Sequence, residues 1–203
     1  MEKNSIIIMA VVAALVFSSA GLVMMVDDGG SDTEDLFVHE GKYVNPNDYT
    51  VDNLMISASD IGEGWVFFDQ FGDEMHGDFF FEKEEVGSIR ISISLMPSIE
   101  EAKSTYLEGL NTVEANYPGF ELLKKCEESF KFFDDSQMDS WVYAYRDLNV
   151  LVVIYLDVAD DEVDDVAQII MAALEKTVHD AASEYSGDPS GSTEPSGPSE
   201  PLQ

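Results

Sequence analysis

The segment Ser88-Ile89-Arg90-Ile91-Ser92-Ile93-Ser94-Leu95 decides the fold class. Isoleucine and leucine alternate strictly with serine and arginine. Successive side chains of a β-strand point to opposite faces, so this alternation predicts a strand with one buried face and one wet face. A half-buried strand of this kind is typical of an antiparallel sheet.

Segments on both sides of this strand predict further strands and two amphipathic helices. Pro97 ends the strand, and Ser98-Ile99-Glu100-Glu101 has the form of a capping box that opens a helix, which Pro118-Gly119 ends. A second helix begins near Asp160 and Asp161, where carboxylates suit the positive end of a helix. Aromatic or β-branched runs predict the other strands at residues 65–71, 78–82, 120–125, 130–133, 141–146 and 150–157.

This order of elements predicts an α+β fold. We expect an antiparallel sheet whose strands pair in sequential order, with the two amphipathic helices packed on one face. Residues 150–154 are continuously apolar, so their strand is expected at the centre of the sheet. Asp147-Leu148-Asn149 is expected to join the last two strands as a tight hairpin.

The amino terminus predicts a single transmembrane helix. Residues 6–26 carry no charge, and at about 1.5 Å per residue they span roughly 30 Å, the thickness of a bilayer core. Lys3 precedes this run, and Asp27 and Asp28 follow it, so residues 1–5 are expected to be a cytoplasmic stub and the remaining chain extracytoplasmic. The alternative is a signal peptide that is cleaved after Ala20, which would release a secreted protein.

Composition sets limits on partners and cofactors. The chain has 41 acidic and 10 basic residues and a formal net charge of −31, which excludes a nucleic-acid partner because phosphate binding needs clustered lysine and arginine. The single cysteine, Cys126, excludes an intramolecular disulfide or a multi-cysteine metal site and is interpreted as a structural thiol. Three interpretations of the acidity stay open: a solvated acidic surface, salt adaptation and cation binding.

Composition also divides the chain. Residues 27–52 are rich in glycine and acid and predict a flexible linker. Residues 183–203 are rich in serine, proline and glycine and predict a disordered tail. The expected folded domain is therefore residues 53–182.

Two short motifs resemble known envelope domains. Ser57-Ala58-Ser59-Asp60-Ile61-Gly62-Glu63-Gly64-Trp65 resembles the helical turn that leads into the first strand of extracytoplasmic sensor-type (PknH-like) domains. The course from Ser98-Ile99-Glu100-Glu101-Ala102 to Pro118-Gly119-Phe120-Glu121-Leu122-Leu123 is similar to PsbP-like α+β sandwiches. The resemblances cover roughly residues 54–180 and imply an α+β fold and an extracytoplasmic location, but no functional residue transfers. The disulfides usual in the sensor-type family are missing here.

The densest acidic cluster is the candidate metal site. Asp157, Asp160, Asp161 and Asp164 lie within one short segment, where carboxylates are the ligands that Ca²⁺ prefers. The spacing does not match an EF-hand loop, and helix capping with a solvated helix face explains the same residues. A Ca²⁺ site here is the only cofactor that the sequence suggests.

The sequence predicts no catalytic residues. His76 lies near Asp73, Glu74 and Asp78, which suggests either a small metal or acid–base cluster or an exposed polar turn. His179, expected in the last turn of the second helix, most simply complements the helix dipole. No nucleophile elbow or phosphate-binding glycine loop is present in the chain.

Phe79, Phe80 and Phe81 are the candidate partner-binding residues. Their rings alternate between the two faces of a strand, so one face enters the core and the other needs a cover. A helix, the tail or another strand is one such cover. Without one, the rings form an apolar patch for a lipid or a protein.

These observations predict a non-enzymatic, membrane-anchored extracytoplasmic domain that binds a ligand or a partner. The bilayer is a partner through residues 6–26, and another membrane or envelope protein is a second one. The alternative is a structural or accessory subunit of an envelope complex, and the third interpretation is an extracellular hydrolase.

Overall fold

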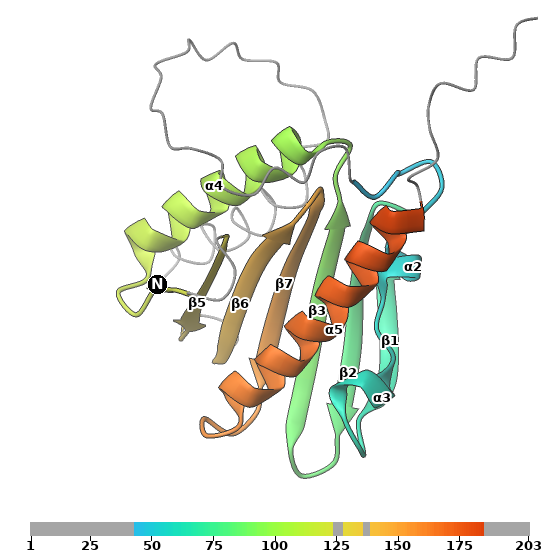
Figure 1. Ribbon diagram of the computed structural model, residues 1–203. Helices are drawn as coiled ribbons and strands as arrows, with labels where there is room; N and C mark the ends of the chain where they lie inside the picture. Colours follow the sequence, from blue (N-terminus) through green and yellow to red (C-terminus); the bar gives the residue numbers. More distant parts are fainter. Residues whose placement is uncertain (1–42, 124–127, 136–138, 185–203) are drawn as a thin grey trace, which may run out of the picture.

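The computed structural model describes residues 43–123, 128–135 and 139–184 (Figure 1). The predicted stub, the anchor at 6–26, the first part of the linker, Cys126 and the tail from residue 185 lie outside the described residues. Within the described ranges, no helix is long and apolar enough to cross a membrane.

Seven antiparallel strands form one sheet. In chain order they are β1 (Val66–Gly72), β2 (His76–Lys83), β3 (Gly87–Leu95), β4 (Glu121–Leu122), β5 (Ser129–Asp134), β6 (Ser140–Asp147) and β7 (Val150–Asp157). Their order across the sheet is β1-β2-β3-β7-β6-β5-β4. The α+β class with an antiparallel sheet is therefore confirmed, and β7 is the central strand, as its continuous apolar run predicts.

The sequential pairing that the element order predicts is wrong at one place. β3 pairs with β7 rather than with β4, in the register Ile91↔Ile154. Helix α4 (Ile99–Asn116) carries the chain from the centre of the sheet to its far edge, and β4 to β7 then return strand by strand (Figure 1). Two antiparallel meanders therefore meet at the β3–β7 pair.

The two long helices pack on opposite faces of the sheet, which corrects the prediction that both lie on one face. The α5 helix (Val163–Glu184) buries its apolar stripe with Val150, Val152 and Ile154 of β7, and the short helices α2 (Val51–Leu54) and α3 (Ala58–Ile61) share that cluster. Helix α4 packs instead with the alternate residues of β7, which include Leu151 and Val153. Because β7 is apolar on both faces, each of its faces needs its own helix.

Local signals fix the start of α4. The hydroxyl of Ser98 accepts a hydrogen bond from the Glu101 amide at 3.1 Å, so the predicted N-cap is confirmed. Ala102, Tyr106 and Val113 then bury one stripe of the helix against β5 to β7.

Residues 43–52 belong to the folded domain, which corrects the predicted linker at its carboxyl end. Val44 and Val51 are buried in the core. Asn149 holds this segment: its side chain accepts from the Val44 amide at 2.8 Å and donates to the carbonyls of Val44 at 2.9 Å and Met96 at 2.7 Å. Asn-Pro-Asn at residues 45–47 is thus part of a turn inside the domain and not a sign of a linker.

Candidate functional site

The sheet is covered differently in its two halves. Among the described helices, α2, α3 and α5 lie on one face of the sheet and α4 lies on the other. Helix α4 packs on the β5–β7 half of that second face. On the same face, β2 and β3 carry polar and aromatic side chains. We call this surface the β1–β3 face; it is defined by His76, Asp78, Phe80, Arg90, Ser92 and Ser94.

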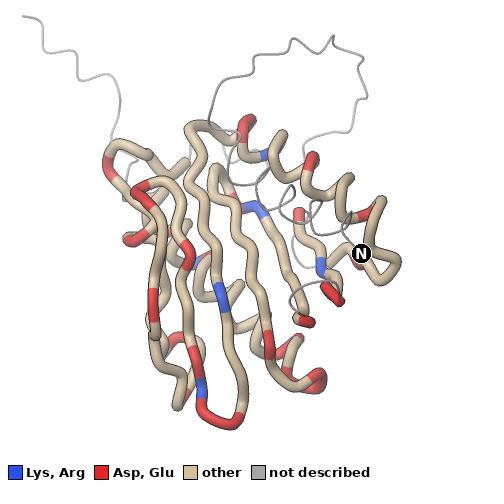
Figure 2. Tube along the Cα trace, turned by 180° about the vertical axis from the view of Figure 1, so that it is seen from behind, with Lys and Arg blue, Asp and Glu red and all other residues tan. Residues whose placement is uncertain are grey.

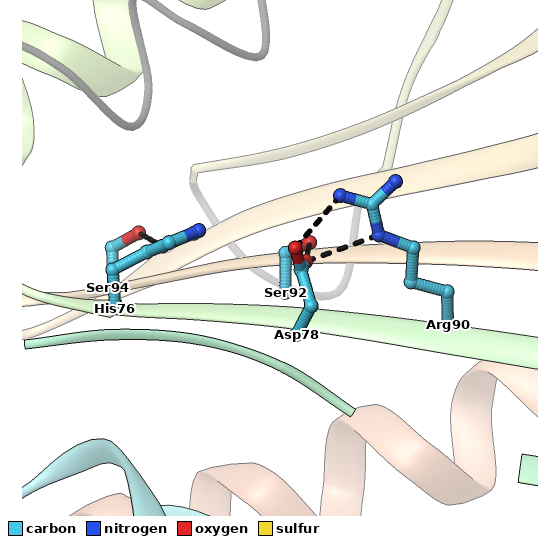
Figure 3. A network of polar contacts seen from close by, with 5 residues as sticks. All are labelled: His76, Asp78, Arg90, Ser92 and Ser94. Carbon is cyan, nitrogen blue, oxygen red and sulfur yellow. Dashed lines mark hydrogen bonds and ion pairs between the residues drawn. The ribbon is translucent and has the colours of Figure 1, made fainter. Parts of the chain in front are cut away.

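An ion pair lies at the centre of the β1–β3 face (Figure 3). Arg90 donates to both carboxylate oxygens of Asp78, from Nε at 3.0 Å and from Nη2 at 2.9 Å. The Ser92 hydroxyl donates to the same carboxylate, and Ser92 is the register partner of Asp78 across the β2–β3 pair. About a quarter of the Arg90 side chain is exposed (25%), and 18% of Asp78, so the pair is accessible from one side.

Arg90 also lies against two aromatic rings. Its guanidinium carbon is 4.9 Å from the centre of the Tyr155 ring and 5.8 Å from that of Phe80. Phe80, Arg90 and Tyr155 are register neighbours on β2, β3 and β7 and therefore form a row across the sheet. Burial raises the pKa of Tyr155 to about 12, against the opposing effect of Arg90, so Tyr155 is a neutral phenol at ordinary pH.

The structure separates the residues of the predicted histidine cluster. His76 Nδ1 lies 2.9 Å from Ser94 Oγ, whereas Asp78 bonds Arg90 and Ser92. Asp73 accepts from the amides of Met75 and His76 and so holds the β1–β2 turn.

The Ser94–His76 pair has the residue types of a nucleophile and a base. The described part of the chain supplies no carboxylate bonded to His76 that would orient it, in the way a triad needs.

Exposed aromatic residues gather on β1, at the edge of the sheet beside this face. Together with the neighbouring Val66, they form the surface that we call the aromatic edge: Val66 (57% exposed), Phe67 (44%), Phe68 (67%) and Phe71 (62%). A β-bulge shifts the register between Phe67 and Asp69, so Phe68 is an extra residue in β1. The Phe71 ring lies 5.7 Å from that of Phe80 in an edge-to-face contact, which joins the aromatic edge to the β1–β3 face.

The three phenylalanines predicted as partner-binding residues have different positions. Phe79 and Phe81 are 2% and 1% exposed, in the core under α5. Only Phe80 reaches the β1–β3 face. The aromatic edge was not predicted from the sequence. Phe67 and Phe68 lie in a predicted strand, and the position of that strand at the edge of the sheet depends on the pairing order.

The acidic candidates for Ca²⁺ have partners of their own. Asp164 accepts from Lys131 Nζ at 2.9 Å and from the Tyr143 hydroxyl, and the bond to Lys131 is the main cause that lowers the pKa of Asp164. Asp160 accepts from the Trp141 indole at 3.2 Å. Asp157 and Asp161 are exposed near the end of β7.

These carboxylates do not converge on a common centre. Within the ranges that the structure describes, no group of three or more histidine, cysteine or acidic side chains is placed to hold a metal ion. His179, predicted to complement the helix dipole, lies 3.1 Å from the Asp147 carboxylate at the β6–β7 hairpin.

Comparisons with known proteins assign the chain to no family. No family model matches the chain, and no curated protein matches it. Among solved structures, a GTP-binding regulator from Thermotoga maritima is similar at 17% identity, over 66% of this chain and 95% of that one, with a TM-score of 0.42. A likeness at this level carries no functional argument.

Proposed function

We propose that the protein is a non-enzymatic binding domain, anchored to a membrane by residues 6–26, that engages a partner protein outside the cytoplasm. The observation that carries the binding proposal is the aromatic edge. Four of the seven large hydrophobic residues that are exposed in the described part of the chain lie on β1. Exposed apolar groups that gather on one element, rather than scatter, mark interaction sites.

The surroundings of the aromatic edge suit a protein partner. Beside Phe71, the β1–β3 face offers the Arg90–Asp78 pair and the ring of Phe80. Aromatic and arginine side chains are the residues that contribute most to protein–protein binding energy. Polar groups that can exchange hydrogen bonds with a partner therefore lie beside the apolar side chains of Val66 and Phe71 on this face.

The test is site-specific photo-crosslinking of the full chain in its own membranes. A photoreactive phenylalanine analogue replaces Phe71. In the matched control the same analogue replaces Ile169, an apolar residue that is also exposed (46%) but lies on α5 and not on β1. We expect a discrete crosslinked product from position 71 and none from position 169. Products of equal yield at both positions, or none at either, would contradict a binding role for β1.

The anchor has a separate test. Intact mass of the membrane-extracted protein shows whether residues 1–20 remain, and extraction with alkaline carbonate shows whether the chain behaves as an integral membrane protein. Retention of both the residues and the membrane fraction supports an anchor. Loss of the first 20 residues would support the cleaved signal peptide instead.

A further inference from the structure

We infer that the partner presents an extended, basic segment that pairs with the outer edge of β1 as an additional strand. This inference rests on the proposed function and gives the partner its chemistry. It combines three features of β1: its position in the sheet, its bulge and the charges around it.

β1 is the last strand on its side of the sheet. Its pairing within the described residues is with β2 alone, so the other edge of its backbone is open to a strand from elsewhere. Proteins commonly guard such an edge with lysine or proline, and β1 (Val-Phe-Phe-Asp-Gln-Phe-Gly) has neither. An edge that lacks both of these residues and is rich in aromatic side chains suits recognition by strand addition over a short segment.

The bulge limits where a new strand can pair. After Phe68, the segment from Asp69 to Gly72 is in regular register with β2, through Asp69↔Phe80 and Phe71↔Asp78. The amide of Gln70 donates to the Asp69 carboxylate at 2.9 Å, a local bond that a strand carbonyl can replace. A short regular segment next to a bulge favours a short partner strand and disfavours long pairing between identical edges.

Charge selects a basic partner over a second copy or an anionic lipid surface. The lysine and arginine residues on β1, β2 and β3 are Lys83 and Arg90. Acidic positions predominate along the described chain (Figure 2). The surrounding acidic residues are Asp69, Asp73, Glu74, Glu82, Glu84 and Glu85. The chain carries a net charge of −31. It therefore repels a second copy of itself and an anionic membrane surface, whereas it attracts a basic segment.

The side chains of β1 specify an alternating pattern in the partner. Asp69 and Phe71 lie on the same side of the sheet as Phe80. A strand paired beside them therefore places its own alternate side chains next to one carboxylate and one apolar ring. The expected partner sequence has lysine or arginine two positions away from an apolar residue, so that both lie on the same face of the added strand, and it has no proline.

The probe is a displayed library of random peptides, about ten residues long, selected against the purified full chain in detergent micelles. We expect the selected peptides to be basic, to carry lysine or arginine two positions away from an apolar residue, and to lack proline at inner positions. Hydrogen exchange with a selected peptide bound is expected to show new protection within residues 69–72, at the amides that point away from β2, because strand addition gives these amides new acceptors.

Matched variants separate the edge from general acidity. Phe68→Ser with Phe71→Ser is expected to weaken binding of a selected peptide at least about tenfold, which corresponds to about 1.4 kcal/mol. The control, Leu107→Ser with Ile169→Ser, removes two exposed apolar residues from the helices and is expected to leave binding unchanged. All four side chains are solvent-exposed, so none of the substitutions should unfold the domain.

Several outcomes would overturn the inference. These are a selection that enriches no peptides, enriched peptides that are not basic, binding that Phe68→Ser with Phe71→Ser leaves intact, and a purified chain that dimerises through β1. If crosslinking from position 71 succeeds in membranes while the peptide result fails, the proposed function stands and the strand-pairing inference is wrong. If both fail, the binding role itself is wrong.

Discussion

The two halves of the sheet are built differently. In the β5–β7 half, α4 packs on one face and α5 on the other, and the side chains between them are mainly apolar, with Ser129, Asp134 and Ser140 buried among them. In the β1–β3 half, α2, α3 and α5 cover one face, while the other carries serines, a histidine and an arginine–carboxylate pair. The same sheet therefore has one half that is covered by a long helix on each face and one half with a polar, partly exposed face.

The central strands show where this difference begins. On β7, both alternating sets of side chains are apolar, so both faces are buried. On β3, one set is isoleucine and leucine, and the other is serine and arginine. The change from one pattern to the other between neighbouring strands marks the border between the two halves.

The largest expected effect compares one phenylalanine from each half. Phe130 on β5 is 2% exposed and contacts the rings of Tyr106 at 5.6 Å and Phe120 at 5.7 Å. Phe130→Ala is expected to lower the free energy of unfolding by about 3–5 kcal/mol, because it leaves a cavity that the neighbours fill only in part. Phe71→Ala, at an exposed position, is expected to lower it by less than about 1 kcal/mol.

Urea unfolding followed by circular dichroism measures both values, with Leu107→Ala as an exposed control on α4. Equal losses for the two phenylalanines would mean that the aromatic edge is part of the core, and the distinction between the halves would be lost.

Much of this architecture was predictable from the sequence, because hydrophobic periodicity is a local signal. The alternation at residues 88–95 and the apolar run at 150–154 correctly predicted β3 and the central strand β7. The pairing of β3 with β7 was missed because it joins segments far apart in the chain, and no local pattern encodes it. The position of α4 was missed although its signal was present: a strand that is apolar on both sides needs a cover on both sides.

The candidate site was less predictable for the same physical reason. Phe67 and Phe79 look alike in the sequence, and only the pairing order makes β1 an edge and β2 an inner strand. The ion pair of Asp78 with Arg90 likewise depends on the register between β2 and β3. Register is a property of the folded sheet, so composition and spacing do not reveal it.

The second prediction tests the border between the halves at Tyr155. The pKa of this phenol is about 12 in the folded state and 10.0 in the unfolded chain, since burial disfavours the phenolate. Between pH 10 and pH 12 the unfolded state therefore loses a proton that the folded state keeps. The free energy of unfolding therefore falls as the pH rises, by roughly 1.4 kcal/mol per pH unit and by up to roughly 3 kcal/mol in total.

Tyr155→Phe removes this contribution, so its stability should fall less steeply than that of the wild type over this pH range. Urea unfolding at pH 9, 10, 11 and 12 measures the difference, and comparison with the wild type cancels the common titration of lysines. Tyr143→Phe, on β6 and away from the border, is the companion variant, because burial also raises the pKa of Tyr143. If wild type and Tyr155→Phe lose stability in parallel, Tyr155 is solvated, and the β1–β3 face extends onto β7.

The smallest expected effect compares one ion pair from each half by double-mutant cycles. Arg90 and Asp78 form two parallel hydrogen bonds and are partly buried, whereas Lys131 bonds Asp164 at a single oxygen, 2.9 Å away, with 62% of the Asp164 side chain exposed. We expect a coupling energy of about 1 kcal/mol for Arg90–Asp78 and less than about 0.5 kcal/mol for Lys131–Asp164. Unfolding of each single and double alanine variant at low and high salt gives both values.

A strong coupling at Arg90–Asp78 has a consequence for binding. A partner that takes either side chain must first break the pair, so the coupling sets a free-energy cost that the new contacts have to exceed. A partner that docks on β1 and leaves the pair intact avoids this cost, and Arg90→Ala would then change its affinity little. A coupling energy near zero, together with a large loss of affinity in Arg90→Ala, would instead move the centre of binding from the aromatic edge to the arginine.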